Sequence, residues 1–199
     1  MNTKTGTVRI IAGHWKRHRL VIPNVPGLRP TPDRVRETLF NWLGHGVRGM
    51  RCLDLFAGTG ALGFEAASRG AAQVVLVERH KTAVRDLETG ARILADREIR
   101  HGITPGVMPK IKIIHSDALR YLEGPARHFD MVFLDPPFES GLLEIVCHLL
   151  NDGRWLDKTT GIYLETRRSS PPPVLPVGWE ITHSAVAGEV RYALAQGCG

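Results

Sequence analysis

From Arg51 to the C-terminus the sequence alternates between short apolar runs and longer runs with helical periodicity. The short runs, which we expect to be strands, are RCLDLF, AQVVLVE, IKIIHSD, DMVFLD, GIYLET, WEITHSAVAG and VRYALAQ. The helical runs that separate the first five are GALGFEAASRG, HKTAVRDLETGARILADRE, ALRYLEG and SGLLEIVCHLLND. Such alternation predicts βαβ units, and therefore an α/β fold with a mainly parallel sheet. The last two runs meet at Gly188–Glu189, a connection too short for a parallel crossover, so we expect them to pair antiparallel.

The N-terminal part does not follow this alternation. We expect residues 1–28 to form a small basic arm and residues 29–199 to form the main domain. Within the arm, the runs RIIAG and HRLVIP could pair as a hairpin around Gly13. The next stretch, GLRPTPDRVRETLFNWL, predicts a helix with Thr31 as its N-cap and Gly44 just past its end. The apolar residues that recur at helical spacing, and should face the core, are Val35, Leu39, Trp42 and Leu43.

Positive charge is concentrated near the N-terminus. The chain carries a net charge of +6, and residues 1–36 contain eight of its Lys and Arg residues but only one acid. A basic arm on a nearly neutral body is typical of nucleic-acid binding, although a solvated tail that aids solubility would have the same composition. Trp15 among these residues favours binding, since aromatic side chains stack on bases. The basic residues that we expect to contact RNA are Arg9, Lys16, Arg17, Arg19, Arg29 and Arg34.

Several classes of protein are disfavoured. No apolar run approaches the roughly 20 residues that span a bilayer, and the N-terminus has no apolar stretch typical of a secretory signal. Cys52, Cys147 and Cys198 are far apart and form no CxxC pair, so neither a disulfide framework nor a zinc site is expected. The histidines have no ligand spacing, and we assign no metal. We expect a cytoplasmic monomer.

Four acids stand at or near the ends of four predicted strands. They are Asp54, Glu78, Asp117 and Asp135. In open α/β sheets, ligands bind beyond the carboxyl ends of the strands. A single acid there is usually a turn former or a helix cap, and capping alone would explain Asp117. Four together predict a ligand site.

A glycine motif follows the first of these strands. In DLFAGTGALG, Gly58, Gly60 and Gly63 form G-x-G-x-x-G between a strand and a helix, which permits a tight turn and close approach of a ligand. Glu78 lies twenty residues beyond Gly58, a spacing that suits a carboxylate gripping ribose hydroxyls. A dinucleotide and S-adenosylmethionine both contain a ribose. Asp54 would repel a pyrophosphate but suits the methionine ammonium, which favours S-adenosylmethionine.

The sequence VFLDPPFES ends an apolar run in an acid followed by two prolines. Pro136 and Pro137 donate no backbone hydrogen bond, so Asp135 and the following carbonyl form a rigid pair of acceptors. Such a pair suits a planar NH2 group, and Phe138 could lie against the ring that bears it. A bare D-P-P is usually only a turn, but the nucleoside-type site predicted beside it favours the functional interpretation.

These motifs resemble those of class I S-adenosylmethionine-dependent methyltransferases. DLFAGTGALG is similar to the cofactor loop of that family, and DPPF to the [DNS]-PP-[YFW] signature of enzymes that methylate exocyclic amino groups. The segments RIIAGHWKRHRLVIP, GLRPTPDRVRETLFNWL and VAGEVRYALAQ extend the similarity over nearly the whole chain to bacterial RsmD-type 16S rRNA (guanine-N2-)-methyltransferases. The sequence departs from that pattern in a longer loop at 101–110 and a proline cluster at 171–173.

The resemblance implies a Rossmann-like fold with a mainly parallel seven-stranded sheet and an antiparallel C-terminal strand. It implies that S-adenosylmethionine is held by Asp54, Phe56, Gly58, Thr59, Gly60, Glu78, Asp117 and Ala118. It further implies that the target guanine is held by Asp135, Pro136, Pro137 and Phe138. The implied partner is the small ribosomal subunit with its 16S rRNA, or a late assembly intermediate, rather than free RNA.

We therefore predict direct, in-line methyl transfer to the N2 amino group of a guanine in 16S rRNA. An N6-adenine methyltransferase acting on DNA or RNA is the alternative, because DPPF does not distinguish the two amino groups. Methylation of a glutamine amide is disfavoured by the basic arm. A non-catalytic RNA-binding assembly factor is disfavoured by the intact glycines and acids, and a nicotinamide-dependent oxidoreductase is the third option.

Overall fold

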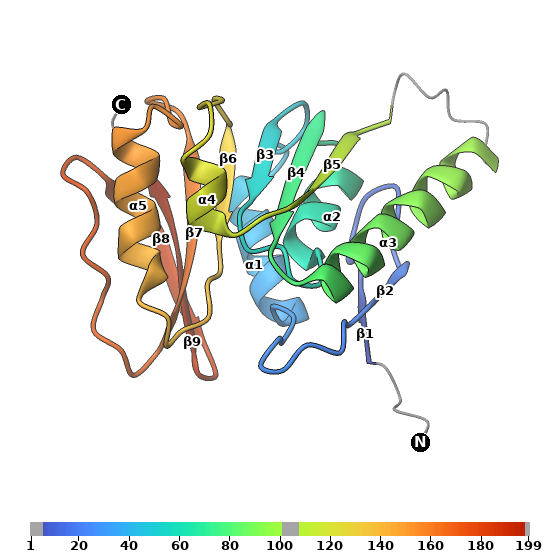
Figure 1. Cartoon of the computed structure of the whole chain (residues 1–199), viewed down its shortest axis with the longest axis horizontal. Coiled ribbons are helices and arrows are strands. Elements are labelled where there is room, and N and C mark those ends of the chain that lie inside the picture. Colours follow the sequence, from blue (N-terminus) through green and yellow to red (C-terminus); the bar gives the residue numbers. More distant parts are fainter. Residues whose placement is uncertain (1–5, 101–107, 198–199) are drawn as a thin grey trace.

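A single seven-stranded sheet forms the centre of the molecule. The structure is a computed structural model that describes residues 6–100 and 108–197. The strands of the sheet are β3 (Arg51–Asp54), β4 (Gln73–Glu78), β5 (Lys110–His115), β6 (Met131–Leu134), β7 (Gly161–Arg167), β8 (Glu180–Ala187) and β9 (Val190–Gln196). Their spatial order is β5-β4-β3-β6-β7-β9-β8 (Figure 1). Strands β3 to β7 are mutually parallel, and β9 runs antiparallel between β7 and β8. The predicted Rossmann-like α/β fold is confirmed.

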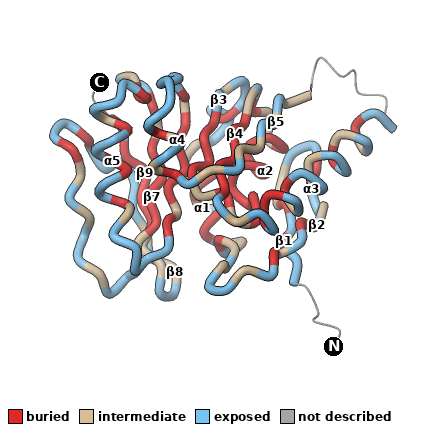
Figure 2. Tube along the Cα trace, in the orientation of Figure 1, coloured by how far each residue is buried: buried red, intermediate tan, exposed pale blue. Residues whose placement is uncertain are grey.

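Helices cover both faces of this sheet. One face carries α1 (Asp33–Leu43), α2 (Ala61–Ser68) and α3 (Lys81–Arg100), and the other carries α4 (Ala118–Leu122) and α5 (Leu142–Asp152). Alternate residues of each central strand enter the two cores: Val74 packs on the first face and Val75 on the second. Figure 2 shows the sheet as a continuous buried layer between helices with exposed outer sides. Because both faces of the sheet are covered, the sequences of the parallel strands are continuous apolar runs.

The expected N-terminal hairpin is present, but its first strand is shifted. β1 (Thr7–Arg9) pairs antiparallel with β2 (Arg19–Val21), so the strand ends where the run RIIAG begins. The amides of Ile11 and Ala12 donate to the buried carboxylate of Glu65 on α2, 2.7 and 3.0 Å away, instead of continuing a ladder. Hydrogen bonds to α2 therefore end the strand and attach the arm to the main sheet.

Helix α1 begins later than the sequence suggests. Its N-cap is Pro32, and no side chain caps it, so the expectation that Thr31 is the N-cap is wrong. The Thr31 hydroxyl instead donates to Asp135. The predicted end is confirmed, because Gly44 closes the helix with a φ of 55°.

The two stretches that depart from the family pattern fall in connections. Residues 101–107 of the loop expected at 101–110 lie outside the described residues, as does Cys198, and β5 begins at Lys110. The prolines at 171–173 lie in the irregular connection between β7 and β8. Among the helices in the described part of the chain, none has the length and apolar character to cross a membrane.

Candidate active site

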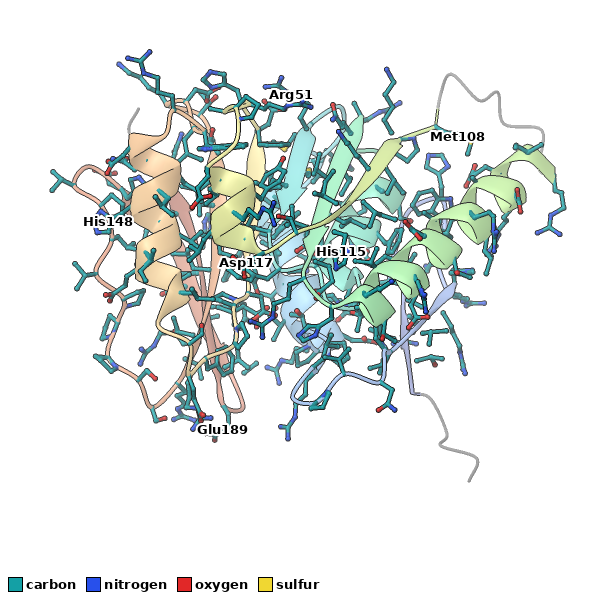
Figure 3. All side chains as sticks on the ribbon, viewed as in Figure 1. Arg51, Met108, His115, Asp117, His148 and Glu189 are labelled. Carbon is teal, nitrogen blue, oxygen red and sulfur yellow. The ribbon has the colours of Figure 1, made fainter. Side chains whose placement is uncertain are left out.

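The carboxyl ends of neighbouring strands bring three of the predicted acids to one edge of the sheet. Asp54 ends β3, Glu78 ends β4, and Asp135 follows the last residue of β6. Since β3 pairs with both β4 and β6, these three residues belong to adjacent strand ends. The labelled His115 and Asp117 lie toward the same edge from β5, whereas Arg51 lies at the opposite end of β3 (Figure 3).

Two of the motif glycines are required by packing. Gly60 has a φ of +75°, and a Cβ there would stand 2.6 Å from side-chain atoms of Leu87 and Phe64. A Cβ on Gly63 would stand 2.2 Å from the Leu76 side chain. Gly63 therefore lets α2 lie directly against β4, and Gly60 leaves room for the Leu87 and Phe64 side chains at the start of α2.

Asp54 is a buried acid that titrates near neutral pH. Its side chain is 2% exposed, and Oδ2 accepts a hydrogen bond of 3.0 Å from the Gly63 amide. Burial raises the pKa of Asp54 to about 7, Asp135 and Glu78 add to this increase, and the Gly63 hydrogen bond opposes it. None of the ion pairs among residues 6–100 and 108–197 includes Asp54. A cationic ligand group would therefore have an unpaired acid to bind.

Glu78 joins the glycine turn to the end of β4. Its Oε2 accepts from the Gly58 amide at 2.9 Å, and its Oε1 accepts from the His80 amide at 2.7 Å. An ionised carboxylate can accept about four hydrogen bonds, so Glu78 can also accept from ligand hydroxyls. Asp54, the glycine turn and Glu78 together fit a ligand that carries a cationic amine and a pair of hydroxyls.

Asp117 acts as a helix cap in this structure. Its side chain accepts a hydrogen bond of 2.9 Å from the Leu119 amide at the start of α4, and Ala118 beside it is buried. This is the simpler of the two interpretations that the sequence allowed. Phe56 and Thr59 lie in the turn between β3 and α2 with the motif glycines.

The DPPF motif forms a rigid edge after β6. Pro136 is buried, Pro137 is exposed, and Phe138 is 39% exposed, so its ring is accessible from outside. The Thr31 hydroxyl donates to Asp135 Oδ2 at 3.2 Å. Burial raises the pKa of Asp135 to about 6, although the hydrogen bond from Thr31 lowers it. Asp135 is therefore a stronger base than an exposed aspartate, and it is ionised above pH 6.

The sequence-based interpretation missed a further acid, Glu165. Leu134 of β6 is opposite Leu164 of β7, so the next residues, Asp135 just after β6 and Glu165 within β7, lie side by side. Glu165 is 2% exposed, and the Tyr163 hydroxyl donates to its Oε1 at 2.8 Å. Burial and the charge of Asp135 raise the pKa of Glu165 well above its usual range. The rule that identified the other acids applies equally to the run GIYLET and would have found it.

A cavity lies beside the DPPF motif. It has a volume of about 180 Å³, and Pro136, Phe138 and Glu165 are among its lining residues. Pro171 and Pro173 are also among its lining residues. The proline cluster at 171–173, for which we predicted no role, therefore borders the same space as the motif.

The six basic residues expected to contact RNA are all exposed. Arg9 pairs with Asp33 at 2.8 Å. Trp15, however, is only 2% exposed and packs in the core with α2 and α3, so the expectation that it stacks on bases is wrong. Its apolar surface secures the arm to the body of the molecule.

Comparison with known proteins identifies the family. The family described as Conserved hypothetical protein 95 matches residues 8–196. Ribosomal RNA small subunit methyltransferase D of Escherichia coli strain K12 is 40% identical over 192 residues, 96% of this chain and 91% of that protein. The solved structure of the methyltransferase yhhF from Escherichia coli has a TM-score of 0.83 and 37% identity, covering 97% of this chain and 99% of that one.

A more distant structure shares the fold alone. The T. thermophilus 16S rRNA N2 G1207 methyltransferase RsmC, solved with AdoMet and guanosine, has a TM-score of 0.65 and 24% identity. It covers 98% of this chain and 50% of its own length. Given the match over nearly all residues and the 40% identity to a curated relative, this chain belongs to the Conserved hypothetical protein 95 family of RsmD-type methyltransferases.

Proposed function

We propose that the protein transfers a methyl group from S-adenosylmethionine to the N2 amino group of a guanine in the 16S rRNA of the small ribosomal subunit. The observation that carries this proposal is Asp135, a half-buried acid with a pKa of about 6, followed by two prolines at a strand end beside the glycine turn. The name of the Escherichia coli relative supports the ribosomal substrate. The fold shared with an N2 guanine methyltransferase is consistent with the base.

The cofactor would bind across the ends of β3 and β4. Asp54, which has no ion-pair partner among the described residues, suits the methionine ammonium. Glu78 retains acceptor capacity for the ribose hydroxyls. When bound, S-adenosylmethionine supplies an electrophilic methyl group. The remaining residues that we assign to this site are Phe56, Gly58, Thr59, Gly60, Asp117 and Ala118.

The target base would lie against the DPPF edge. Asp135 and the Pro136 carbonyl would accept the two amino hydrogens, which favours a pyramidal nitrogen with its lone pair directed at the methyl group. As the new carbon–nitrogen bond forms, the carbon–sulfur bond breaks, and the N2 proton passes to Asp135. The raised pKa of Asp135 strengthens it as the acceptor of that proton. Phe138 would stack on the extruded base and offset part of the stacking that it loses.

The substrate would be an assembled particle rather than free RNA. Arg9, Lys16, Arg17, Arg19, Arg29 and Arg34 would bind phosphates and set the orientation of the RNA without reading its sequence. We expect the enzyme to act as a monomer in the cytoplasm. Pro137 would contribute only to the shape of the DPPF motif.

Transfer of labelled methyl from S-adenosylmethionine to unmodified small subunits, followed by nucleoside analysis, tests the proposal. We expect labelled N2-methylguanosine in 16S rRNA. Labelled N6-methyladenosine would support methylation of an amino group at the DPPF motif but would contradict guanine as the target base. Absence of label in RNA would overturn the substrate.

A further inference from the structure

The buried hydroxyl of Thr31 is used in the active site although Thr31 and Asp135 lie 104 positions apart in sequence. Thr31 is 5% exposed and stands one residue before Pro32, the N-cap of α1. Helix α1 has no side-chain cap, and the hydroxyl donates to Asp135 Oδ2 at 3.2 Å. The hydroxyl of Thr31 therefore serves the Asp135 carboxylate and not the end of the helix.

The segment that carries Thr31 borders both halves of the site. It follows β2 and runs past the carboxyl ends of the strands (Figure 1). Leu28 in this segment lies 3.5 Å from the position that a Cβ on Gly58 would occupy. One short stretch of chain therefore contacts the glycine turn through Leu28 and the DPPF motif through Thr31.

The groups that face Asp135 include no cation among the described residues. They are Thr31 before α1, Tyr163 and Glu165 on β7, and Asp54 on β3. Asp135 and Glu165 lie side by side on neighbouring strands, and the charge of Asp135 raises the pKa of Glu165.

The Thr31 hydroxyl acts on the Asp135 carboxylate through its hydrogen bond. A hydroxyl that donates to a carboxylate stabilises its ionised form. It lowers the pKa of Asp135 against the effect of burial, and it also lowers the pKa of Glu165. With Oδ2 engaged by Thr31, the other oxygen of Asp135 is left for a substrate hydrogen.

We propose that Thr31 is a positioning residue: its hydroxyl holds Asp135 Oδ2 and thereby presents Oδ1 to the target amino group. This inference rests on the proposed function of Asp135. Thr31 itself touches neither the base nor the methyl group, and its effect is exerted through the carboxylate.

The test compares Thr31→Val, Thr31→Ser and wild type in the full-length protein, with Thr38→Val as the control. Thr38 lies in α1, and its hydroxyl donates only to the Arg34 carbonyl of the same helix, at 3.0 Å. The measurements are kcat and KM for methyl transfer to small subunits from pH 5 to 9, cofactor affinity by calorimetry, and thermal unfolding.

For Thr31→Val we expect kcat to fall by roughly tenfold to a hundredfold, the effect of losing a hydrogen bond to a charged group. The acid limb of the pH profile should move to a higher pH than the wild-type limb near 6, because the ionised form of Asp135 has lost its donor. KM and cofactor affinity should stay within about twofold, as expected for a group that acts only on the chemical step. Thr31→Ser should restore both kcat and the wild-type position of the acid limb. Thr38→Val should match wild type in both measurements.

The proposal would be overturned if Thr31→Val lowered thermal stability but left kcat and the acid limb of the pH profile as in wild type. Thr31 would then have only a structural role. Failure of Thr31→Ser to improve on Thr31→Val would also overturn it. In an Asp135→Asn background, Thr31→Val should cause no further loss of kcat, because both changes act on the same carboxylate. If wild type labels adenine, the proposed base is wrong, but the same comparison still decides the role of Thr31.

Discussion

At the scale of single residues, the reaction depends on one carboxylate whose surroundings make it a moderately strong base. Asp135 is ionised above pH 6, so it can accept amino hydrogens at neutral pH and still take up the proton released by the product. Positioning and electrostatics can then supply most of the rate enhancement, without a covalent intermediate on the enzyme.

Asp135→Asn should therefore reduce kcat by about a hundredfold or more, on the scale seen for lost preorganised polar groups. An asparagine keeps the size of the side chain but removes the charge and the proton acceptor. Cofactor affinity measured by calorimetry should be nearly unchanged, since Asp54 and Glu78 are intact. Turnover at the wild-type rate would exclude Asp135 as the reactive carboxylate.

The sequence predicted the strand-end acids because the rule that places ligands at strand ends needs only local patterns. It did not predict the contact between Thr31 and Asp135, because nothing local indicates that a threonine before a helix will bond to a residue 104 positions away. The burial of Trp15 was missed for the same reason: an aromatic residue among basic ones reads as exposed until its tertiary partners are known.

At the scale of elements, two helical glycines differ in whether the surrounding packing leaves room for a Cβ. Gly63 lies where α2 meets β4, and a Cβ there would stand 2.2 Å from the Leu76 side chain. Gly90 lies inside α3, and a Cβ there would meet Phe64 and Leu20 at ordinary distances of 3.7 to 3.8 Å. The first glycine is required by helix–sheet packing, whereas the second is only tolerated.

Gly63→Ala should lower the free energy of unfolding by about 1–3 kcal/mol through overpacking. Gly90→Ala should raise it by about 0.5–1 kcal/mol, because alanine loses less conformational entropy in a helix interior. Urea unfolding of both variants beside wild type checks the pair. Equal changes of the same sign in the free energy of unfolding would contradict the conclusion that packing requires Gly63 but not Gly90.

At the same scale, the contribution of the N-terminal arm's charges to RNA binding must be tested by substitution and not by deletion of the arm. Val8, Ile10, Trp15 and Leu20 are buried in the same cluster as α2 and α3, so deleting the arm would damage the core. This also explains why strand boundaries in the arm could not be predicted: they depend on Glu65, an acid on a helix far along the chain.

Lys16→Gln combined with Arg19→Gln should reduce the slope of log affinity against log salt by about 1.5, since each phosphate contact contributes roughly 0.7–0.9. The control is Arg48→Gln with Lys158→Gln, two exposed basic residues outside the arm. Filter binding of 16S rRNA at several salt concentrations measures the slopes. If both pairs flatten the slope equally, the arm is no more than a charged tail.

At the scale of the whole molecule, the buried acids couple stability to pH. The pKa of Asp54 is about 7 in the folded protein, above its ordinary value of 3.8. The folded state therefore binds this proton more tightly than the unfolded state, so the contribution of Asp54 to stability is present at low pH and lost as pH rises through 7.

Without cofactor, the wild-type protein should become less stable relative to Asp54→Asn as pH rises from 5 to 7, by at most about 1.4 kcal/mol per pH unit. The asparagine keeps an oxygen for the Gly63 amide but does not titrate. Thermal unfolding of both proteins across this range gives the difference. Parallel curves would show that Asp54 is ionised in the folded protein throughout.

The order of the sheet has a consequence for synthesis. β9 is the last strand along the chain, yet it lies inside the sheet, between β7 and β8. Until residues 190–196 have been translated, β7 has an open edge and β8 has no partner in the sheet. An unpaired edge of this kind recruits strands from other chains, so a polypeptide that stops before Val190 should aggregate rather than fold. An enzyme whose proposed substrate is the small ribosomal subunit thus completes its own sheet only after a ribosome has made residues 190–196.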